Sequence, residues 1–259
     1  MIDLHSHLLP AVDDGSESVE QSWEVCGRMA SRGVTDICLT PHLAVAELGE
    51  RLSSRLAAHD KAFSSLSAHA RAAPHLHRGV ELMLNERLSD EALVNRRISL
   101  AGSRYILVEF PRTLSALAMR GLLNEITGRG FVPVVAHPER YAEASTAEVF
   151  AWRDLGAAIQ VDATTIIENK SARGVRAREL LQAGLADILA ADNHGDDRML
   201  PTAYAYLDQV GAPDAAELLL RHNPLAILED RALEPVPPIQ FRRSWATAVR
   251  RLFSQVTPF

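Results

Sequence analysis

Seven short apolar runs, separated by longer helical stretches, limit how this chain can fold. The runs are MIDLH, DICLTPH, HRGVEL, YILVEF, VPVVAHP, AAIQVDA and ADILAAD. They are almost continuously apolar, which is typical of parallel strands that are buried on both faces. Helices are predicted between them at 17–32, 50–71, 86–98, 113–129, 145–155 and 172–183. This alternation indicates an α/β fold, and we expect a single barrel, with an open doubly wound sheet as the alternative.

The barrel pattern ends near residue 230. Gly130, Gly156 and Gly184 follow predicted helices and are natural helix stops, and no linker interrupts the chain before that point. The stretch EPVPPIQ at 234–240 then carries prolines that are typical of an extended connector. We therefore predict a domain over 1–230, followed at 231–259 by a connector and a basic amphipathic helix.

Charge and cysteine content exclude several classes of protein. The 259 residues have a formal net charge of −6 and show no basic footprint for nucleic acid. Cys26 and Cys38 are the only cysteines, too few for a disulfide framework. The chain has no signal-peptide pattern and no run of 18 apolar residues. We expect a soluble cytoplasmic protein.

Metal-binding residue types stand at the carboxyl ends of most of the apolar runs. In a barrel or a parallel sheet these ends share one face, where active sites lie. Asp14, or its neighbour Asp13, adds a carboxylate from the loop after the first run. The candidate ligands are His5, His7, Asp14, His42, Glu81, Glu109, His137, Asp192 and His194.

Nine ligands are too many for one catalytic metal ion, which needs about three protein ligands and a water. They suit two or three divalent ions, and a mixture of imidazoles and carboxylates fits manganese, iron or zinc. Clustered metals are the usual device for hydrolysing phosphate esters. Arg140 and Arg198 follow two of the histidines closely and are expected to hold phosphate oxygens.

The motifs DLHSHLLPAVDDG, TPH, GVEL, VEFP, AHPER and ADNH resemble those of the PHP (polymerase and histidinol phosphatase) superfamily. More narrowly, over residues 1–230, they resemble the CpsB/CapC type of bacterial metal-dependent protein-tyrosine phosphatase. The resemblance implies a distorted (β/α)7 barrel and three divalent ions, usually manganese. It also implies a phosphotyrosine substrate on the C-terminal tail of a membrane-associated tyrosine autokinase, which controls capsular or exopolysaccharide synthesis and export.

The resemblance also distributes the ligands. One metal takes His5, His7, Glu81 and Asp192, a second shares Glu81 and adds Glu109 and His137, and a third takes Asp14, His42 and His194. Arg140 binds the phosphoryl group. We expect a hydroxide that bridges the metals to attack phosphorus in line, without a covalent phospho-enzyme.

Other interpretations of single motifs remain. The HSH motif also opens the amidohydrolase pattern, but Lys61 and Lys170 do not follow apolar strands as that pattern requires. Cys26 satisfies C-x5-R, the signature of cysteine-dependent tyrosine phosphatases, yet it falls on the apolar face of a predicted helix. His75 and His77 precede their strand's apolar part, so we predict a surface role, and His59 is predicted to be solvated.

Two other functions stay open. One is another PHP-type phosphoesterase, such as histidinol-phosphate phosphatase. The other is a non-catalytic scaffold that regulates a kinase by binding it. The basic helix at 241–254 is expected to dock on the barrel, to lie on an anionic membrane surface or to contact a partner.

Overall fold

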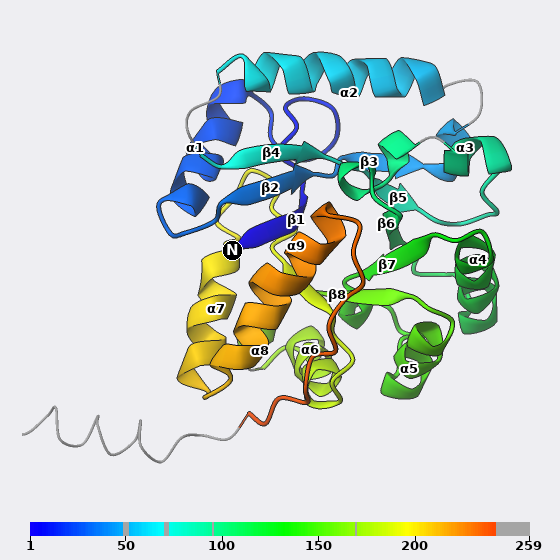
Figure 1. Ribbon diagram of the computed structural model, residues 1–259, viewed down its shortest axis with the longest axis vertical. Coiled ribbons are helices and arrows are strands. Elements are labelled where there is room, and N and C mark those ends of the chain that lie inside the picture. Colours follow the sequence, from blue (N-terminus) through cyan, green and yellow to red (C-terminus); the bar gives the residue numbers. More distant parts are fainter. Residues whose placement is uncertain (49–51, 70–72, 95, 169, 242–259) are drawn as a thin grey trace, which may run out of the picture.

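The structure of the chain is a computed structural model that describes residues 1–48, 52–69, 73–94, 96–168 and 170–241 (Figure 1). Its strands are β1 (Ile2–Ser6), β2 (Asp36–Leu39), β3 (His42–Ala44), β4 (His75–Arg78), β5 (Glu81–Met83), β6 (Tyr105–Glu109), β7 (Val132–Ala136), β8 (Ala158–Asp162) and β9 (Ile188–Ala190). Its α-helices are α1 (Val19–Ala30), α2 (Leu52–Ser67), α3 (Asp90–Val94), α4 (Ala116–Gly128), α5 (Thr146–Asp154), α6 (Ala172–Gln182), α7 (Leu200–Gln209), α8 (Pro213–Glu217) and α9 (Asn223–Leu228).

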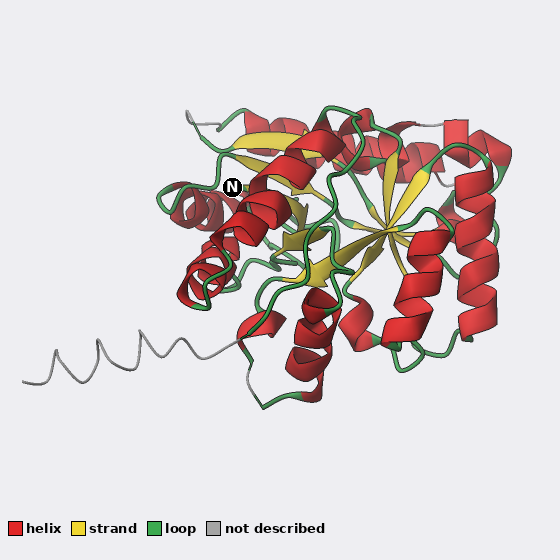
Figure 2. Cartoon of the chain, turned by 60° about the horizontal axis from the view of Figure 1, so that its bottom comes forward, coloured by secondary structure: helices red, strands yellow, loops and turns green. Residues whose placement is uncertain are grey.

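All strand pairs are parallel and fall into two sheets. One sheet has the order β1-β2-β4 and the other has the order β3-β5-β6-β7-β8-β9. The strands occupy the interior and the helices surround them (Figure 2). The predicted α/β class with buried parallel strands is therefore confirmed.

Two of the predicted strands are broken in the middle. β2 ends before Thr40 and Pro41, and β3 begins at His42; β4 ends before Gly79, and β5 begins at Glu81. Pro41 has no N–H to donate to a ladder, which favours a break there. The prediction that His42 and Glu81 end their strands is therefore wrong in detail, because each begins a short second strand.

The outer edges of the two sheets meet where β1 approaches the end of β9. Ser6 and Asn193 form an isolated parallel bridge, and the His7 N–H donates to the Asn193 carbonyl at 2.7 Å. The Asp192 N–H donates to the His5 carbonyl at 3.0 Å. These bonds join the first and last strands at the level of the candidate ligands, while closure of all the strands into one barrel stays a prediction.

Most helices lie where the apolar periodicity predicts them. Several of them, including α1, α4, α5 and α6, begin at a serine whose hydroxyl accepts a backbone N–H of the first turn, which stabilises the helix start. These N-caps are Ser18, Ser115, Ser145 and Ser171. The predicted helix over 86–98 is wrong in extent, since the described residues of that range form the short α3 and a 3₁₀ turn at Arg96–Ile98, and residues 86–89 are not helical.

The predicted connector after residue 230 forms neither helix nor strand over 231–241, and two of its apolar residues belong to the packed core. Val236 is 5% exposed and Ile239 is 3% exposed. The Ile239 N–H donates to the carbonyl of Leu181 at the end of α6, at 3.0 Å. Residues packed against the core therefore continue to at least residue 239. Apart from Phe241, the predicted basic helix at 241–254 lies outside the described residues.

Among the helices of the described ranges, none is long and apolar enough to cross a bilayer.

We predict that Ile239→Ala lowers the free energy of unfolding by about 2–4 kcal/mol, because it leaves a cavity against α6. Val175→Ala is the control: Val175 lies on α6 itself but is 43% exposed, so its loss is expected to cost less than about 1 kcal/mol. Urea unfolding followed by circular dichroism measures both values. Equal losses in the two variants would show that 231–241 is a loose connector.

Candidate metal centre

Strand β1 places two imidazoles side by side. Because side chains alternate along a strand, His5 and His7 share the inner face and Ser6 points away, where its hydroxyl donates to the Cys38 carbonyl at 2.9 Å. Both imidazoles are fully buried. The Nε2 atoms of His5 and His7 lie 3.2 Å apart, so both rings face one point.

Two buried carboxylates face the same point. Glu81 Oε2 lies 3.2 Å from His5 Nε2 and 3.3 Å from His7 Nε2. Asp192 Oδ1 lies 3.3 Å and 3.4 Å from the same two nitrogens. Glu81 and Asp192 are each 1% exposed. Four predicted ligands from β1, β5 and the end of β9 therefore surround one small volume.

Glu81 connects this volume to the next. Its Oε1 lies 2.9 Å from His137 Nε2, and its Oε2 lies 3.0 Å from His42 Nδ1. His42 Nδ1 is also 3.2 Å from Glu109 Oε1. Glu81, Glu109 and His42 can hold one ion between them. The arrangement thus places His42 beside the set of Glu81, Glu109 and His137 that the family resemblance implies.

A third group lies at the mouth of the site. Asp14 Oδ1 is 3.5 Å from His42 Nε2 and 3.6 Å from His194 Nε2. The rings of His7 and His194 stack, with their centroids 4.0 Å apart. Suitable ligand atoms of these four residues lie within 4.8 Å of one another. All nine predicted ligands therefore belong to one connected cluster.

The donor atoms fit divalent cations. Glu81 Oε2 and Glu109 Oε1 are buried and carry no hydrogen bond of standard geometry within the described chain. Ligand atoms about 2.0–2.1 Å from a tetrahedral ion lie roughly 3.4 Å from one another, and the atoms around the first volume are 3.2–3.4 Å apart. Two buried carboxylate oxygens that face imidazole nitrogens without a hydrogen bond are the arrangement that a cation completes.

Two of these residues hold a strained backbone. His137 has a φ of 35° and Asp192 has a φ of 48°, both in the left-handed region. Such conformations cost about 1–3 kcal/mol each for residues with a side chain, and they concentrate at functional sites. Here they turn the chain sharply after β7 and β9, just where each side chain faces the cluster.

Charge balance in the cluster shifts several pKa values. Burial opposes ionisation of Glu81 and Asp192, yet the neighbouring histidines hold the pKa of both carboxyls well below the usual range. Burial also opposes protonation of His42, but Glu109 and Glu81 raise the pKa of its imidazole to about 10. Without a cation, protons on the imidazoles balance the buried carboxylates.

Both predicted phosphate-binding arginines reach the outer oxygen of Asp192. Arg140 follows His137 on a 3₁₀ turn, and it pairs with Asp192 Oδ2 and, at 3.0 Å, with Asp162 Oδ2. Arg198 Nη1 lies 3.3 Å from Asp192 Oδ2. The two guanidinium groups are 22% and 28% exposed. They therefore border the cluster and remain partly open to solvent.

Comparison with known proteins agrees with this geometry. The profile of the family described as capsular polysaccharide synthesis, CpsB/CapC, matches residues 1–229. The chain belongs to the CpsB/CapC family. It is 28% identical over 208 residues to the tyrosine-protein phosphatase YwqE of Bacillus subtilis, covering 75% of this chain and 77% of YwqE. It is 27% identical over 245 residues to the tyrosine-protein phosphatase CpsB of Streptococcus pneumoniae, covering 90% of this chain and all of CpsB.

A solved structure supports the same relationship. A crystal structure from the work on YwqE and CpsB, described there as unique metal-dependent tyrosine phosphatases, matches with a TM-score of 0.69 and 25% identity. The match covers 93% of this chain and all of the solved one. The predicted membership of the CpsB/CapC group is confirmed.

Sequence analysis did not predict the residues that contact the outer ring nitrogens of the metal-binding histidines. Gln160 Oε1 lies 3.0 Å from His5 Nδ1, and the Tyr141 hydroxyl lies 3.4 Å from His137 Nδ1. Such outer contacts fix the tautomer and the orientation of a metal-binding imidazole. Gln160 had a detectable signal, because it stands two residues before Asp162 and so on the same face of β8.

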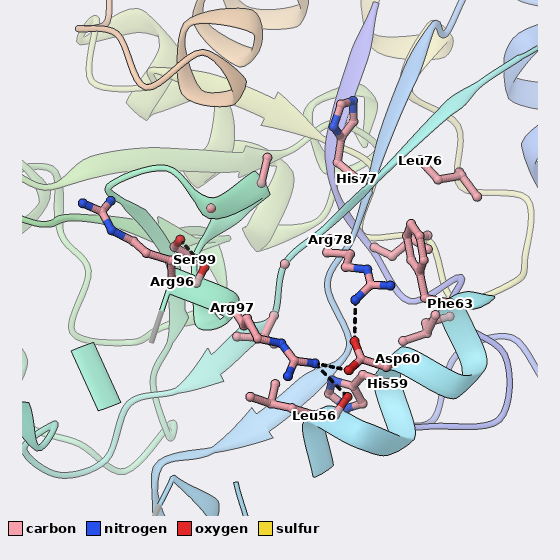
Figure 3. Close-up of a pocket in the computed structure, with 16 residues that line it drawn as sticks. Leu56, His59, Asp60, Phe63, Leu76, His77, Arg78, Arg96, Arg97 and Ser99 are labelled. Carbon is pink, nitrogen blue, oxygen red and sulfur yellow. Dashed lines mark hydrogen bonds and ion pairs between the residues drawn. The ribbon is translucent and has the colours of Figure 1, made fainter. Parts of the chain in front are cut away.

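The cysteine and histidine residues that sequence analysis did not assign to metal binding lie outside the cluster. Cys26 is fully buried in α1, where burial raises the pKa of its thiol to about 12. His77 pairs with Asp36 at 2.8 Å on β4. His59, predicted to be solvated, is only 8% exposed because it faces the sheet from α2. It lines a cavity of about 470 Å³ beneath that helix (Figure 3), which contains none of the nine candidate ligands.

We predict that metal binding releases protons. At pH 7 the His42 imidazole is protonated in the metal-free chain, because its pKa is raised to about 10, and a ligand must be neutral. Apparent affinity should therefore rise with pH, by up to about tenfold per unit for each proton released. Calorimetry of Mn²⁺ binding in two buffers of different ionisation enthalpy counts the protons. His77→Gln is the control and should leave the count unchanged. Binding without proton release would contradict the prediction.

Proposed function

We propose that this chain is a metal-dependent protein-tyrosine phosphatase, a phosphoric monoester hydrolase. The observation that carries the proposal is the connected cluster of five imidazoles and four carboxylates beside two arginines. It lies on the fold of a family whose relatives YwqE and CpsB are named tyrosine-protein phosphatases. We further propose that the strands form one distorted (β/α)7 barrel over residues 1–230.

We assign the ligands to three divalent ions, with manganese as the first choice and iron or zinc as alternatives. His5, His7, Glu81 and Asp192 would hold the first ion. Glu81, Glu109 and His137 would hold the second, with His42 adjoining it. Asp14, His42 and His194 would hold the third. Short distances within the first and third sets support this grouping; in the second set His137 contacts Glu81, and Glu109 contacts His42.

The chemistry divides between the ions and the protein. Bound divalent ions supply Lewis acidity and a water molecule of lowered pKa, which hydrolysis of a phosphate ester at neutral pH requires. Arg140 and Arg198 lie on one side of the cluster, where their planar guanidinium groups can orient phosphate oxygens. Their pairing with Asp192 keeps both groups at the edge of the site before substrate arrives.

The substrate we propose is phosphotyrosine on the C-terminal tail of a membrane-associated tyrosine autokinase in capsular or exopolysaccharide synthesis. The family description, capsular polysaccharide synthesis, supports that pathway. The segment 241–254 is our candidate for contact with the kinase or with the membrane surface beneath it.

We predict that chelation abolishes activity, whereas Cys26→Ser leaves it within about twofold of the wild type. Cys26 is buried and its pKa is raised to about 12, so it cannot act as a thiolate nucleophile near neutral pH. Hydrolysis of a phosphotyrosine peptide is measured before and after EDTA, and after addition of Mn²⁺, Zn²⁺, Fe²⁺ and Mg²⁺ in turn.

Activity that survives EDTA but disappears in Cys26→Ser would overturn the metal-dependent mechanism. Histidinol phosphate and an oligonucleotide are assayed in parallel. Faster turnover of either one would replace the phosphotyrosine substrate with that of another phosphoesterase. A metal-loaded chain that hydrolyses none of the three would indicate a scaffold.

We predict that Arg140→Gln lowers kcat/KM for the phosphotyrosine peptide by about 10²-fold at saturating Mn²⁺, because one charged donor to the transferring phosphoryl group is lost. Arg221→Gln is the control, since Arg221 pairs with Glu217 far from the cluster. Metal content is measured on the same samples. If excess Mn²⁺ restores full activity to Arg140→Gln, the residue supports Asp192 and does not bind phosphate.

A further inference from the structure

The adjacent carboxylates of the DDG turn point to different partners. Asp14 faces His42 Nε2 and His194 Nε2 at the mouth of the cluster, and its side chain is 71% exposed. The Asp13 side chain is 5% exposed and turns inward to the far side of the His7 ring. We propose that Asp13 is a positioning residue, which orients His7 and the backbone of His42 without itself binding a metal. This proposal rests on the proposed function only for the presence of the metals.

The contact between Asp13 and His7 fixes the tautomer and the orientation of the His7 ring. Asp13 Oδ2 lies 2.7 Å from His7 Nδ1. An ionised carboxylate can only accept a hydrogen bond, so His7 must carry its proton on Nδ1. When the imidazole is neutral, as a metal ligand must be, its lone pair then lies on Nε2, which is the atom 3.3 Å from Glu81 Oε2 and 3.4 Å from Asp192 Oδ1. A carboxylate behind a metal-binding imidazole also makes the imidazole a stronger donor.

The same carboxylate holds two stretches of backbone. Oδ2 accepts the N–H of His42, at 3.0 Å, where β3 begins after the strand break. Oδ1 accepts the N–H of Gly15, at 3.0 Å, and so closes the DDG turn. Asp13 therefore connects β1, the turn that carries Asp14, and the start of β3.

These three segments serve all three ligand groups. His7 belongs to the first group and to the group at the mouth, and His42 belongs to the group at the mouth and to the group of Glu81 and Glu109. Because outer contacts of this kind typically change metal affinity by 10–100-fold, the loss of Asp13 should weaken binding without removing a ligand.

Asp13→Asn and Asp14→Asn form a matched pair, with the same change in volume and charge at adjacent positions. Mn²⁺ bound per chain is counted by atomic emission after equilibrium dialysis, and Mn²⁺ affinity is measured by electron paramagnetic resonance of the free ion. We expect Asp13→Asn to keep the wild-type number of ions at saturation with 10–100-fold weaker affinity. Asp14→Asn should bind one ion fewer at any concentration. Thermal unfolding in EDTA checks that both variants fold.

A second measurement uses only the wild-type chain, so its result does not depend on whether a variant folds. ¹⁵N NMR of the Zn²⁺-loaded wild-type chain should show His7 protonated at Nδ1 and metal-bound through Nε2. Metal bound through Nδ1 would overturn the proposal. So would loss of one ion per chain in Asp13→Asn, which would make Asp13 a ligand, or an affinity within twofold of the wild type. Because neither measurement uses a substrate, a chain that binds Mn²⁺ but fails to hydrolyse phosphotyrosine would refute the proposed function and leave this test intact.

Discussion

Burial of carboxylates beside imidazoles is the constraint on which the rest of this structure depends. Glu81 and Asp192 are almost completely buried, although an isolated buried charge costs several kcal/mol. The chain offsets that cost with histidines on one side and with Arg140 and Arg198 on the other. Such a cluster is neutral only when protons or metal ions occupy it. The left-handed backbone at Asp192 and His137 shows that the fold accepts strain to keep these groups together.

Parallel strands explain why much of this site could be predicted from the sequence. The carboxyl ends of parallel strands share one face, so ligand-type residues as far apart as His7 and His194 were expected to meet, and the structure brings them together. The strand breaks before His42 and Glu81 were not predicted, because the apolar sequence is the same whether the strand is continuous or broken. Pro41 at the first break and Gly79 at the second were the local signals.

The features that stayed out of reach of the sequence depend on side-chain direction and on neighbours distant in the chain. Periodicity does not encode which of two adjacent aspartates in a turn faces inward, because hydrogen bonds to remote groups such as the His42 N–H decide it. The contact of Gln160 with His5 joins residues 155 positions apart. Likewise, the prolines near residue 235 predict extended backbone, but only the surface of α6 makes Ile239 a core residue.

The turn after β1 folds tightly back onto the end of its own strand. A Cβ atom on Gly15 would lie 1.9 Å from the His7 carbonyl oxygen, which also accepts the N–H of Ser16 at 2.8 Å. The turn is therefore held against the backbone of His7 within about ten consecutive residues, and the His42 N–H completes the placement of the Asp13 carboxylate. Most of the candidate metal centre is built from strand ends that are distant in sequence, but this part of it is formed by residues close together in the chain. Any residue other than glycine at position 15 would have to displace the His7 carbonyl, and would thereby disturb His7 and both adjoining aspartates together.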